Sequence, residues 1–179
     1  SYRVNEDIII PKNTKLIIES GADIDFINGA GFLSLSPVEL IGTAKKGVFI
    51  HSSDNSANGF TVIAPDSKSK IIHTQFNGFS SLKNYNRSLT GAVTFYESEL
   101  EIEHSSFLNN HCEDGLNLIR CKFTMDNTTI SGSFSDGFDA DFCQGEVNTS
   151  FFRNAGNDCL DFSGSKITVK SCLISNAQD

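Results

Sequence analysis

Three short stretches of the C-terminal half decide the fold: Asp-Gly-Leu-Asn-Leu at 114–118, Asp-Gly-Phe-Asp-Ala at 136–140, and Asp-Cys-Leu-Asp-Phe at 158–162. They begin 22 positions apart and align without gaps. Three further columns keep the same register: Met125, Val147 and Val169; Ile130, Phe152 and Ile174; Gly132, Asn154 and Asn176. A fixed period of this length is typical of a solenoid, in which each repeating unit stacks on its neighbours.

The length of the repeat restricts its architecture. A strand–helix–strand unit needs about 30 residues or more. Short β-branched and aromatic runs dominate the sequence, and few segments carry the helical period of about 3.6 residues. We therefore predict an all-β chain that folds as a single-stranded right-handed parallel β-helix, with coils of about 22 residues and three short strands per coil.

The repeat continues upstream with one interruption. Ile71 and Phe76 start one coil, and their equivalents Ile102 and Phe107 follow 31 positions later. The extra residues fall in the polar stretch 78–89 (GFSSLKNYNRSL), which we predict to be a loop that bulges from the stack. A solenoid tolerates such an insertion because each coil contacts only its neighbours.

These spacings predict the domain organisation. We expect one β-helix domain over 1–179, with irregular coils over 1–65 and regular coils over 66–179. Asn86 is the most accessible of the glycosylation sequons because it lies in the inserted loop. The next coil would start just after Asp179, so either a separate element caps this end or the solenoid continues as part of a longer polypeptide; we expect the continuation.

Alternation of apolar and polar residues assigns the faces of each coil. In Leu160-Asp161-Phe162 the apolar side chains should point into the stack and Asp161 should point out. Two predicted core columns follow: Leu116, Phe138 and Leu160; Leu118, Ala140 and Phe162.

The charge of the chain excludes two classes of partner. There are 14 Lys and Arg against 22 Asp and Glu, which gives a formal net charge of −8. Nucleic acids and anionic membranes attract basic surfaces, so neither is expected to bind. No run of about 20 apolar residues is present, so we expect no membrane insertion.

Five cysteines occur, all in the C-terminal half: Cys112, Cys121, Cys143, Cys159 and Cys172. No C-x-x-C pair exists, which argues against a zinc ribbon or a thioredoxin-type site. Cys121 and Cys143 lie 22 positions apart and should stack. Free thiols are favoured, and a disulfide remains the alternative.

The histidines form no metal-binding sequence pattern. His73 and His104 occupy equivalent positions, three residues before Phe76 and Phe107. Asn127, Thr149 and Ser171 continue this column in later coils. We expect an interior polar ladder there rather than a metal site.

Stacking gathers carboxylates along one edge of the coils. Residues 22 positions apart should lie about 4.8 Å from one another. The predicted columns are Asp114, Asp136 and Asp158 at a turn, and Asn117, Asp139 and Asp161 facing outward, with Asp141 and Glu113 beside them. Two like charges at this spacing repel by about 1 kcal/mol in water, and by about 3–4 kcal/mol at an effective dielectric constant of about 20.

Three arrangements could relieve this repulsion. Ca²⁺ could bind the clustered oxygen atoms. The carboxyl groups could keep protons at raised pKa values, as acid–base catalysis requires. The carboxylates could instead accept hydrogen bonds from turn N–H groups, which would need no function at all. A solenoid repeats its turn residues, so the outward Asp139 and Asp161 are the more informative pair.

The acidic motifs resemble those of polygalacturonases. Ser-Asp-Gly-Phe-Asp at 135–139 is similar to N-T-D-G-x-D, and Gly-Asn-Asp-Cys at 156–159 is similar to Q-D-D-C. The resemblance implies that Asp136 and Asp158 activate a water molecule. The general acid of that family aligns with Asn157, which cannot donate a proton as a carboxylic acid does.

A second resemblance is to calcium-dependent pectate lyases, whose ligands include D-D-G-x-D. Asp136 and Asp139 match the last two acidic positions, and Ser135 replaces the first. These lyases also use a Lys or Arg base, for which Lys166 and Lys170 are the available residues. Both families belong to the pectin-lyase-like β-helix superfamily. The opening pattern, with Ile-Ile-Ile-Pro and Leu-Ile-Ile-Glu, also resembles the first coils of secreted β-helix proteins.

Two functional hypotheses follow. The first is a secreted or cell-surface domain that binds or processes an acidic polysaccharide. Its predicted residues are Asp136 and Asp158 for catalysis; Asp139, Asp161 and Asn157 for substrate; and Asp136, Asp139, Asp141, Asp158 and Asp161 for Ca²⁺. The second is a non-catalytic structural or adhesive module of a larger cell-surface or spore-coat-type protein, since the same fold serves both roles.

Overall fold

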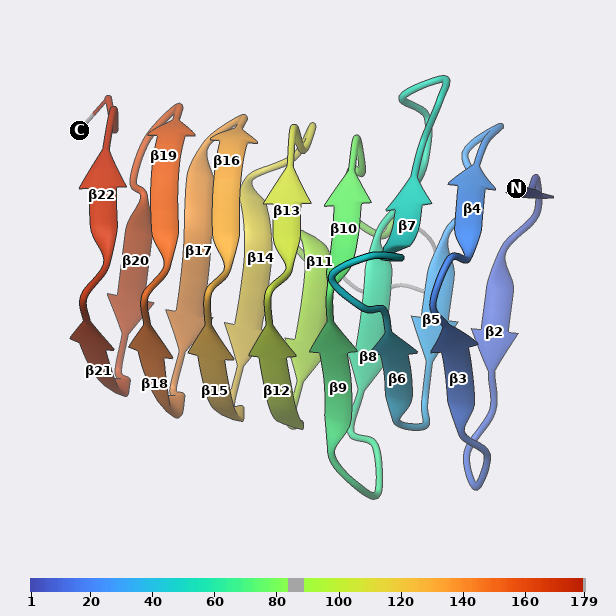
Figure 1. The fold of residues 1–179 in the computed structure, drawn as a ribbon, viewed down its shortest axis with the longest axis horizontal. Helices are drawn as coiled ribbons and strands as arrows, with labels where there is room; N and C mark the ends of the chain where they lie inside the picture. Colours follow the sequence, from blue (N-terminus) through green and yellow to red (C-terminus); the bar gives the residue numbers. More distant parts are fainter. Residues whose placement is uncertain (84–88, 179) are drawn as a thin grey trace.

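A computed structural model describes residues 1–83 and 89–178. The chain winds through about seven coils of a right-handed parallel β-helix, and every coil contributes one strand to each of three parallel sheets (Figure 1). The described residues form no helix, so none of them is a candidate membrane-spanning helix. The predicted fold class is confirmed.

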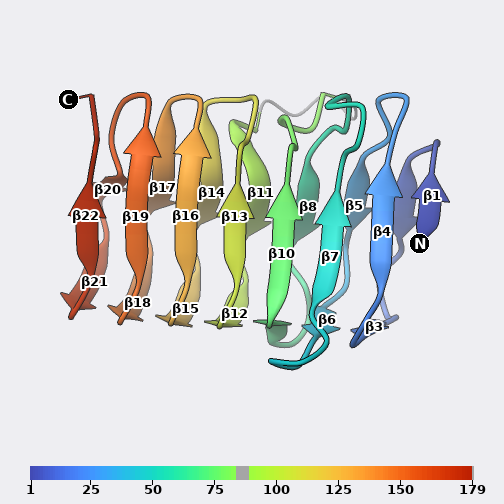
Figure 2. The ribbon, with the colours of Figure 1, turned by 45° about the horizontal axis from the view of Figure 1, so that its top comes forward.

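The three sheets form the faces of a prism. Sheet A contains β1 (Tyr2–Val4), β4 (Asp23–Phe26), β7 (Val48–His51), β10 (Thr74–Asn77), β13 (Ser106–Leu108), β16 (Thr129–Ser133), β19 (Phe151–Ala155) and β22 (Leu173–Ser175), side by side in Figure 2. Sheet B contains β2 (Ile8–Ile10), β5 (Phe32–Ser34), β8 (Phe60–Ile63), β11 (Gly91–Tyr96), β14 (Asp114–Ile119), β17 (Asp136–Asp141) and β20 (Leu160–Ser163). Sheet C contains β3 (Leu16–Glu19), β6 (Val38–Ile41), β9 (Ser69–Ile72), β12 (Glu99–Glu103), β15 (Lys122–Asp126), β18 (Gln144–Asn148) and β21 (Lys166–Lys170).

The register agrees with the spacing in the sequence. Ile71 pairs with Ile102, and Phe76 pairs with Phe107, across the interval of 31 positions. Every pair between β14, β17 and β20 lies 22 positions apart. The predicted columns of Met125, Ile130 and their equivalents in the next two coils are also confirmed.

The core consists of inward columns of apolar side chains. Phe138 is fully buried, and its ring contacts Phe123, Phe152 and Phe162 with centroids 5.4–6.2 Å apart. Both predicted core columns pair in register. Burying a phenylalanine contributes about 1.5–3 kcal/mol, so these stacked rings hold successive coils together.

Residues in the left-handed region mark the corners between sheets. At the corner between sheets C and A, five stacked residues have φ between 45° and 54°: His73, His104, Asn127, Thr149 and Ser171. A single residue with positive φ turns the chain sharply between two strands, at a cost for residues other than glycine and asparagine. We call this edge the C–A corner.

The residue after the corner carries a hydroxyl or thiol group. Thr128 N donates to Ser150 Oγ at 3.1 Å in the next coil. At the corner between sheets B and C, Cys121 N donates to Cys143 Sγ at 3.3 Å, and Cys143 N donates to Ser165 Oγ at 2.8 Å. These cysteines therefore take the place of serines in an inner hydrogen-bonded ladder. All five cysteines are free thiols, as the sequence favoured.

Two insertions break the regular stack. Residues 43–46 form a hairpin between β6 and β7, closed by an antiparallel bridge between Thr43 and Lys46. The predicted loop 78–89 follows β10, and in its described part Leu82 is buried against Leu33 and Ile63 of sheet B. Asn86, the predicted glycosylation site in this loop, lies outside the described residues.

Candidate functional site

An acidic strip lies on the outer face of sheet B in the C-terminal coils. Asn117, Asp139 and Asp161 are direct partners in the parallel register of β14, β17 and β20. Asn117 is 1% exposed, Asp139 is half-buried and Asp161 is exposed, so the strip emerges gradually toward the C-terminal end. We define the acidic ladder as Asp114, Asn117, Asp136, Asp139, Asp141, Asp158 and Asp161.

The amide of Asn117 joins the two columns of the ladder. Its Nδ2 donates to Asp139 Oδ2 at 2.6 Å and to Asp114 Oδ2 at 3.0 Å. The opposite amide orientation would place Oδ1 against both carboxyl groups, which is unfavourable unless one of them carries a proton. Oδ1 is buried and has no hydrogen-bond partner among the described residues. This end of the ladder therefore lacks a hydrogen-bond donor or a cation.

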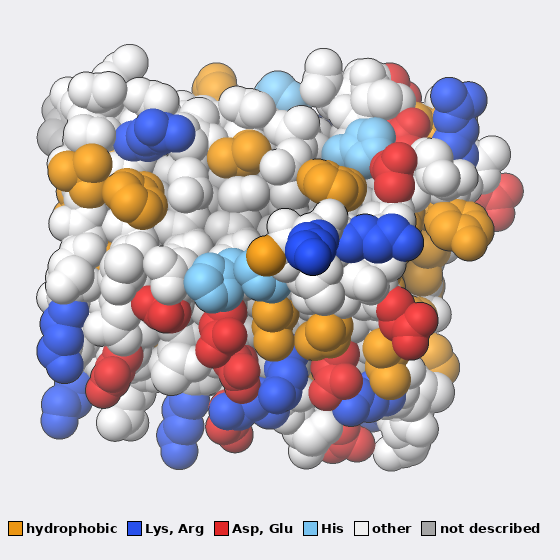
Figure 3. All heavy atoms as spheres, in the orientation of Figure 1, with side chains coloured by type: hydrophobic (Ala, Val, Ile, Leu, Met, Phe, Trp, Pro, Cys, Tyr) orange, Lys and Arg blue, Asp and Glu red, His pale blue; other side chains and the backbone are white. Residues whose placement is uncertain are grey.

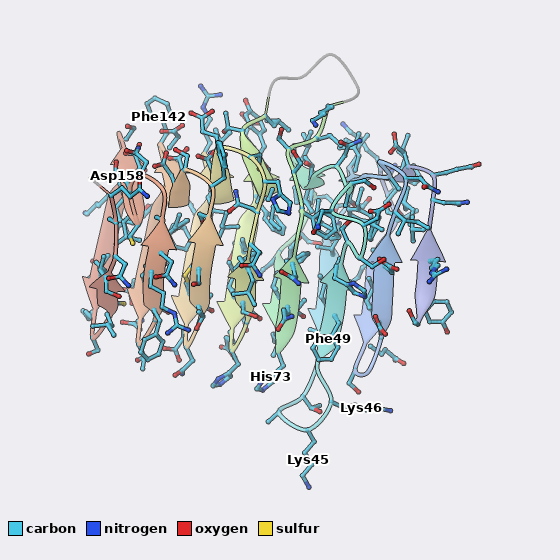
Figure 4. All side chains as sticks on the ribbon, turned by 90° about the horizontal axis from the view of Figure 1, so that it is seen from above. Lys45, Lys46, Phe49, His73, Phe142 and Asp158 are labelled. Carbon is cyan, nitrogen blue, oxygen red and sulfur yellow. The ribbon has the colours of Figure 1, made fainter. Side chains whose placement is uncertain are left out.

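Asp136 accepts hydrogen bonds from the turn of the next coil. Its Oδ1 accepts hydrogen bonds from Asn157 Nδ2 and from Asp158 N, both at 2.9 Å. Asn157, which occupies the general-acid position of the polygalacturonase motif, is thus a donor that orients Asp136. Asp158 is half-buried one coil further on (labelled in Figure 4). The structure places this predicted catalytic pair together, in the arrangement that a purely structural turn would also produce.

Burial and mutual repulsion alter the acidity of the ladder. Burial, together with the charges of Asp114, Asp141 and Asp161, raises the pKa of Asp139 to about 8. Burial also raises the pKa of Asp114 to about 6, even though this carboxyl accepts a hydrogen bond from Asn117. At neutral pH the centre of the ladder thus keeps a proton, which is one of the three predicted ways to relieve repulsion.

The ladder has no cationic partner in the described parts of the chain. None of the ion pairs formed by residues 1–83 and 89–178 involves a ladder carboxylate. Lys166 and Lys170, the residues available for a lyase-like base, lie on β21 in sheet C. The structure therefore does not bring them to the acidic ladder.

The spacing of the ladder carboxylates determines how well they can coordinate a metal ion. Within the described residues, no group of three or more His, Cys, Asp or Glu side chains converges to hold a metal ion. Strand spacing of about 4.8 Å spreads the carboxylates along a line. Because Ca²⁺ takes about six to eight oxygen ligands, the described carboxylates of the ladder supply only part of a calcium coordination shell.

The histidine column lies outside the stack, so the prediction of an interior ladder was wrong. The rings of His73 and His104 stack with centroids 4.6 Å apart and planes 8° apart, and His104 is exposed. Both residues have positive φ at the C–A corner, and this conformation directs the side chain away from the core. The period shows that two residues are equivalent but not on which side of the wall they lie.

The sequence analysis also missed a groove beside these histidines. It has a volume of about 230 Å³ and lies between the hairpin 43–46 and the stacked rings. The groove is lined by residues that include Thr43, Phe49, His73, Gln75, His104 and Ser106. The available signal was Gly42-Thr43-Ala44-Lys45-Lys46-Gly47, a polar insertion between two strand-like runs.

Fold and site together define the class of protein: a right-handed parallel β-helix with an acidic outer face. No protein-family profile matches the sequence, and the comparisons with curated proteins and with solved structures found no match either. The fold alone is compatible with many activities, so the residues of the site carry the information on function.

Proposed function

We propose that this chain is a secreted or cell-surface glycan-binding module of the pectin-lyase-like type. It holds an acidic polysaccharide against the acidic ladder, with Ca²⁺ shared between the two. The observation that carries the proposal is the set of outward carboxylates on sheet B that no described Lys, Arg or His neutralises.

The incomplete metal geometry supports a shared ion rather than a resident one. Asp139 and Asp161 are adjacent and face outward, so they can supply part of a coordination shell. Ca²⁺ prefers carboxylate and hydroxyl oxygens, which an acidic sugar also provides. The likeness of Ser135-Asp136-Gly137-Phe138-Asp139 to the pectate-lyase motif supports the same ligand class.

Binding is better supported than processing. A processing enzyme would rely on Asp136 and Asp158, but Asp136 already accepts hydrogen bonds from Asn157 Nδ2 and Asp158 N. Asn157 cannot serve as a carboxylic general acid, and β21 carries Lys166 and Lys170 on another face. We therefore propose a non-catalytic role.

One observation favours the second candidate, a structural or adhesive module without a glycan ligand. Asp139 keeps a proton at neutral pH, and Asp136 is satisfied by Asn157 and the turn. Two members of the ladder are thus stabilised without any ion. The two candidates differ in their response to calcium.

Calorimetric titration of oligogalacturonate, with and without CaCl₂, tests the proposed function. We expect Ca²⁺ to strengthen binding about tenfold or more in the wild-type protein, because the ion screens two sets of carboxylates. Asp139→Asn/Asp161→Asn should remove the calcium-dependent part. Glu99→Gln/Glu146→Gln is the matched control, since both side chains lie on sheet C.

A calcium effect of the same size in wild type and in the ladder variant would contradict the proposal. Absence of any calcium effect on binding or on thermal unfolding would favour the structural module. Appearance of unsaturated or reducing ends during incubation would instead establish processing.

A further inference from the structure

We infer that the groove at the C–A corner is a second binding site, specific for an acidic saccharide and independent of metal. The ligand class rests on the proposed function. The residues are different, however, and they lie on the opposite side of the prism from the acidic ladder. Figure 4 shows Lys45, Lys46, Phe49 and His73 on one side of the stack and Asp158 toward the other.

The groove exists because one coil departs from the repeat. The hairpin 43–46 leaves the stack between β6 and β7, at the corner where later coils place a single residue. His73 and His104 continue the corner in the next two coils and form the facing wall. Insertions that depart from a solenoid repeat often carry its binding surface.

The lining combines a flat apolar surface with hydrogen-bonding groups. Phe49 points outward from β7 and is 45% exposed. Gln75 and Ser106 follow it in register on β10 and β13. An exposed aromatic ring suits the C–H face of a sugar, and amide and hydroxyl groups next to it suit the sugar hydroxyls.

The charge of the groove differs from that of the chain as a whole, which has a formal net charge of −8. None of its lining residues is acidic. Lys45 lies at the tip of the hairpin and points away from the stack, next in sequence to the lining residue Ala44, while the Lys46 side chain lies over Gly21. Neither lysine forms an ion pair within the described residues, and neither histidine ring has a hydrogen bond there. Figure 3 shows Lys or Arg side chains and His side chains near one another at the centre of one face.

A larger hollow on sheet C is a weaker candidate. It has a volume of about 480 Å³, but its lining mixes both signs of charge. Lys68, for example, is already paired with Glu99 at 3.2 Å. A carboxylate-bearing sugar would have to compete there with the protein's own acids. No acidic side chain lines the C–A groove, and Lys45 on the adjacent hairpin forms no ion pair among the described residues, so a carboxylate-bearing sugar meets less competition there.

Binding of oligogalacturonate in the presence of EDTA tests this inference. Without divalent ions the acidic ladder cannot contribute, so the remaining affinity reports the C–A groove. We expect Lys45→Glu to weaken binding by about tenfold and Phe49→Ala by about fivefold or more. Lys122→Glu on sheet C makes the same charge change elsewhere and should leave affinity within about twofold.

Ring-proton NMR signals locate the ligand independently of these substitutions. Oligogalacturonate should shift the signals of His73 and His104 and leave that of His111 unchanged. A neutral oligogalactan should bind at least about tenfold more weakly than the acidic oligomer.

Three results would overturn the inference: no binding in EDTA, an equal loss with Lys122→Glu, or displacement of the sugar by an equal concentration of inorganic sulfate. Calcium-dependent binding that requires Asp139 and Asp161, together with no binding in EDTA, would support the ladder alone, so the two proposals fail separately.

Discussion

The acidic ladder and the C–A groove are opposite in nearly every property. The ladder lies on a sheet face in the most regular coils, and it repeats carboxylates at each turn of the chain. The groove lies at a corner in the irregular coils, and it is formed by one hairpin that occurs once. The ladder has acids without ion-pair partners among the described residues, whereas the groove has no acidic lining residue and lies beside a hairpin that carries Lys45 and Lys46. Regular repetition and a single exception thus produced two surfaces of opposite charge on one stack.

The difference also affects how much each region says about function. A solenoid repeats whatever residue suits its turn, so part of the ladder, such as Asp136, satisfies backbone N–H groups. The hairpin with Lys45 and Lys46 satisfies no such need of a neighbouring coil. A feature that the repeat does not require carries the stronger functional argument.

The largest expected effect on stability comes from substituting glycines that lie against the backbone of the neighbouring coil, one in each region. A Cβ on Gly137 would lie 2.7 Å from the Cys159 carbonyl oxygen, and one on Gly42 would lie 2.3 Å from the His73 carbonyl oxygen. We expect Gly137→Ala and Gly42→Ala each to lower the free energy of unfolding by about 2–3 kcal/mol, measured by urea titration.

Their effects on binding should differ. Gly137→Ala should abolish calcium-dependent binding, and Gly42→Ala should abolish binding in EDTA. If either variant stayed within about 0.5 kcal/mol of wild type, the close backbone contact at that position would not be real.

A medium effect is expected from pH, and only at the ladder. The pKa of Asp139 is about 8 in the folded chain and about 4 in an unfolded one. Between these values the folded state binds more protons, so stability should fall as the pH rises from about 4 to about 8. The half-buried position limits the change to about 1–2 kcal/mol between pH 6 and 8.

Asp139→Asn is the corresponding variant. It removes the titrating group, so stability between pH 6 and 8 should become flat, and the variant should be more stable than wild type at pH 8. A steeper decline in the variant than in the wild type would show that Asp139 is not the group responsible. Thermal unfolding at both pH values without calcium gives the answer.

The smallest effect concerns the C–A corner. Asparagine tolerates positive φ better than other non-glycine residues, so His73→Asn should change stability by less than about 0.5 kcal/mol. His73→Val is the control, because a β-branched residue in this conformation should cost about 1–2 kcal/mol. Equal stability of the two variants, measured by urea titration, would show that the corner is not strained.

The sequence predicted those features that depend on the period. Columns such as Leu116, Phe138 and Leu160, and the loop between Phe76 and Phe107, follow from counting residues. The period does not distinguish inside from outside at a corner, and for this reason the position of the His73 column was predicted wrongly. The period also cannot predict a buried atom without a hydrogen-bond partner, such as Asn117 Oδ1, because this depends on the orientation of one side-chain amide.

The stack of coils has a consequence for how the molecule responds to damage. Each coil contacts only the coils before and after it. The stability of the stack is therefore approximately the sum of the stabilities of single coils and of the interfaces between neighbouring coils. The hairpin belongs to the coil of β6 and β7, whereas Asp139 lies on β17, several coils away. Local unfolding of the coils at one end should therefore leave the coils at the other end folded. Hydrogen exchange should show protection that varies coil by coil, lowest at the terminal coils, with substitutions altering only the nearest amides.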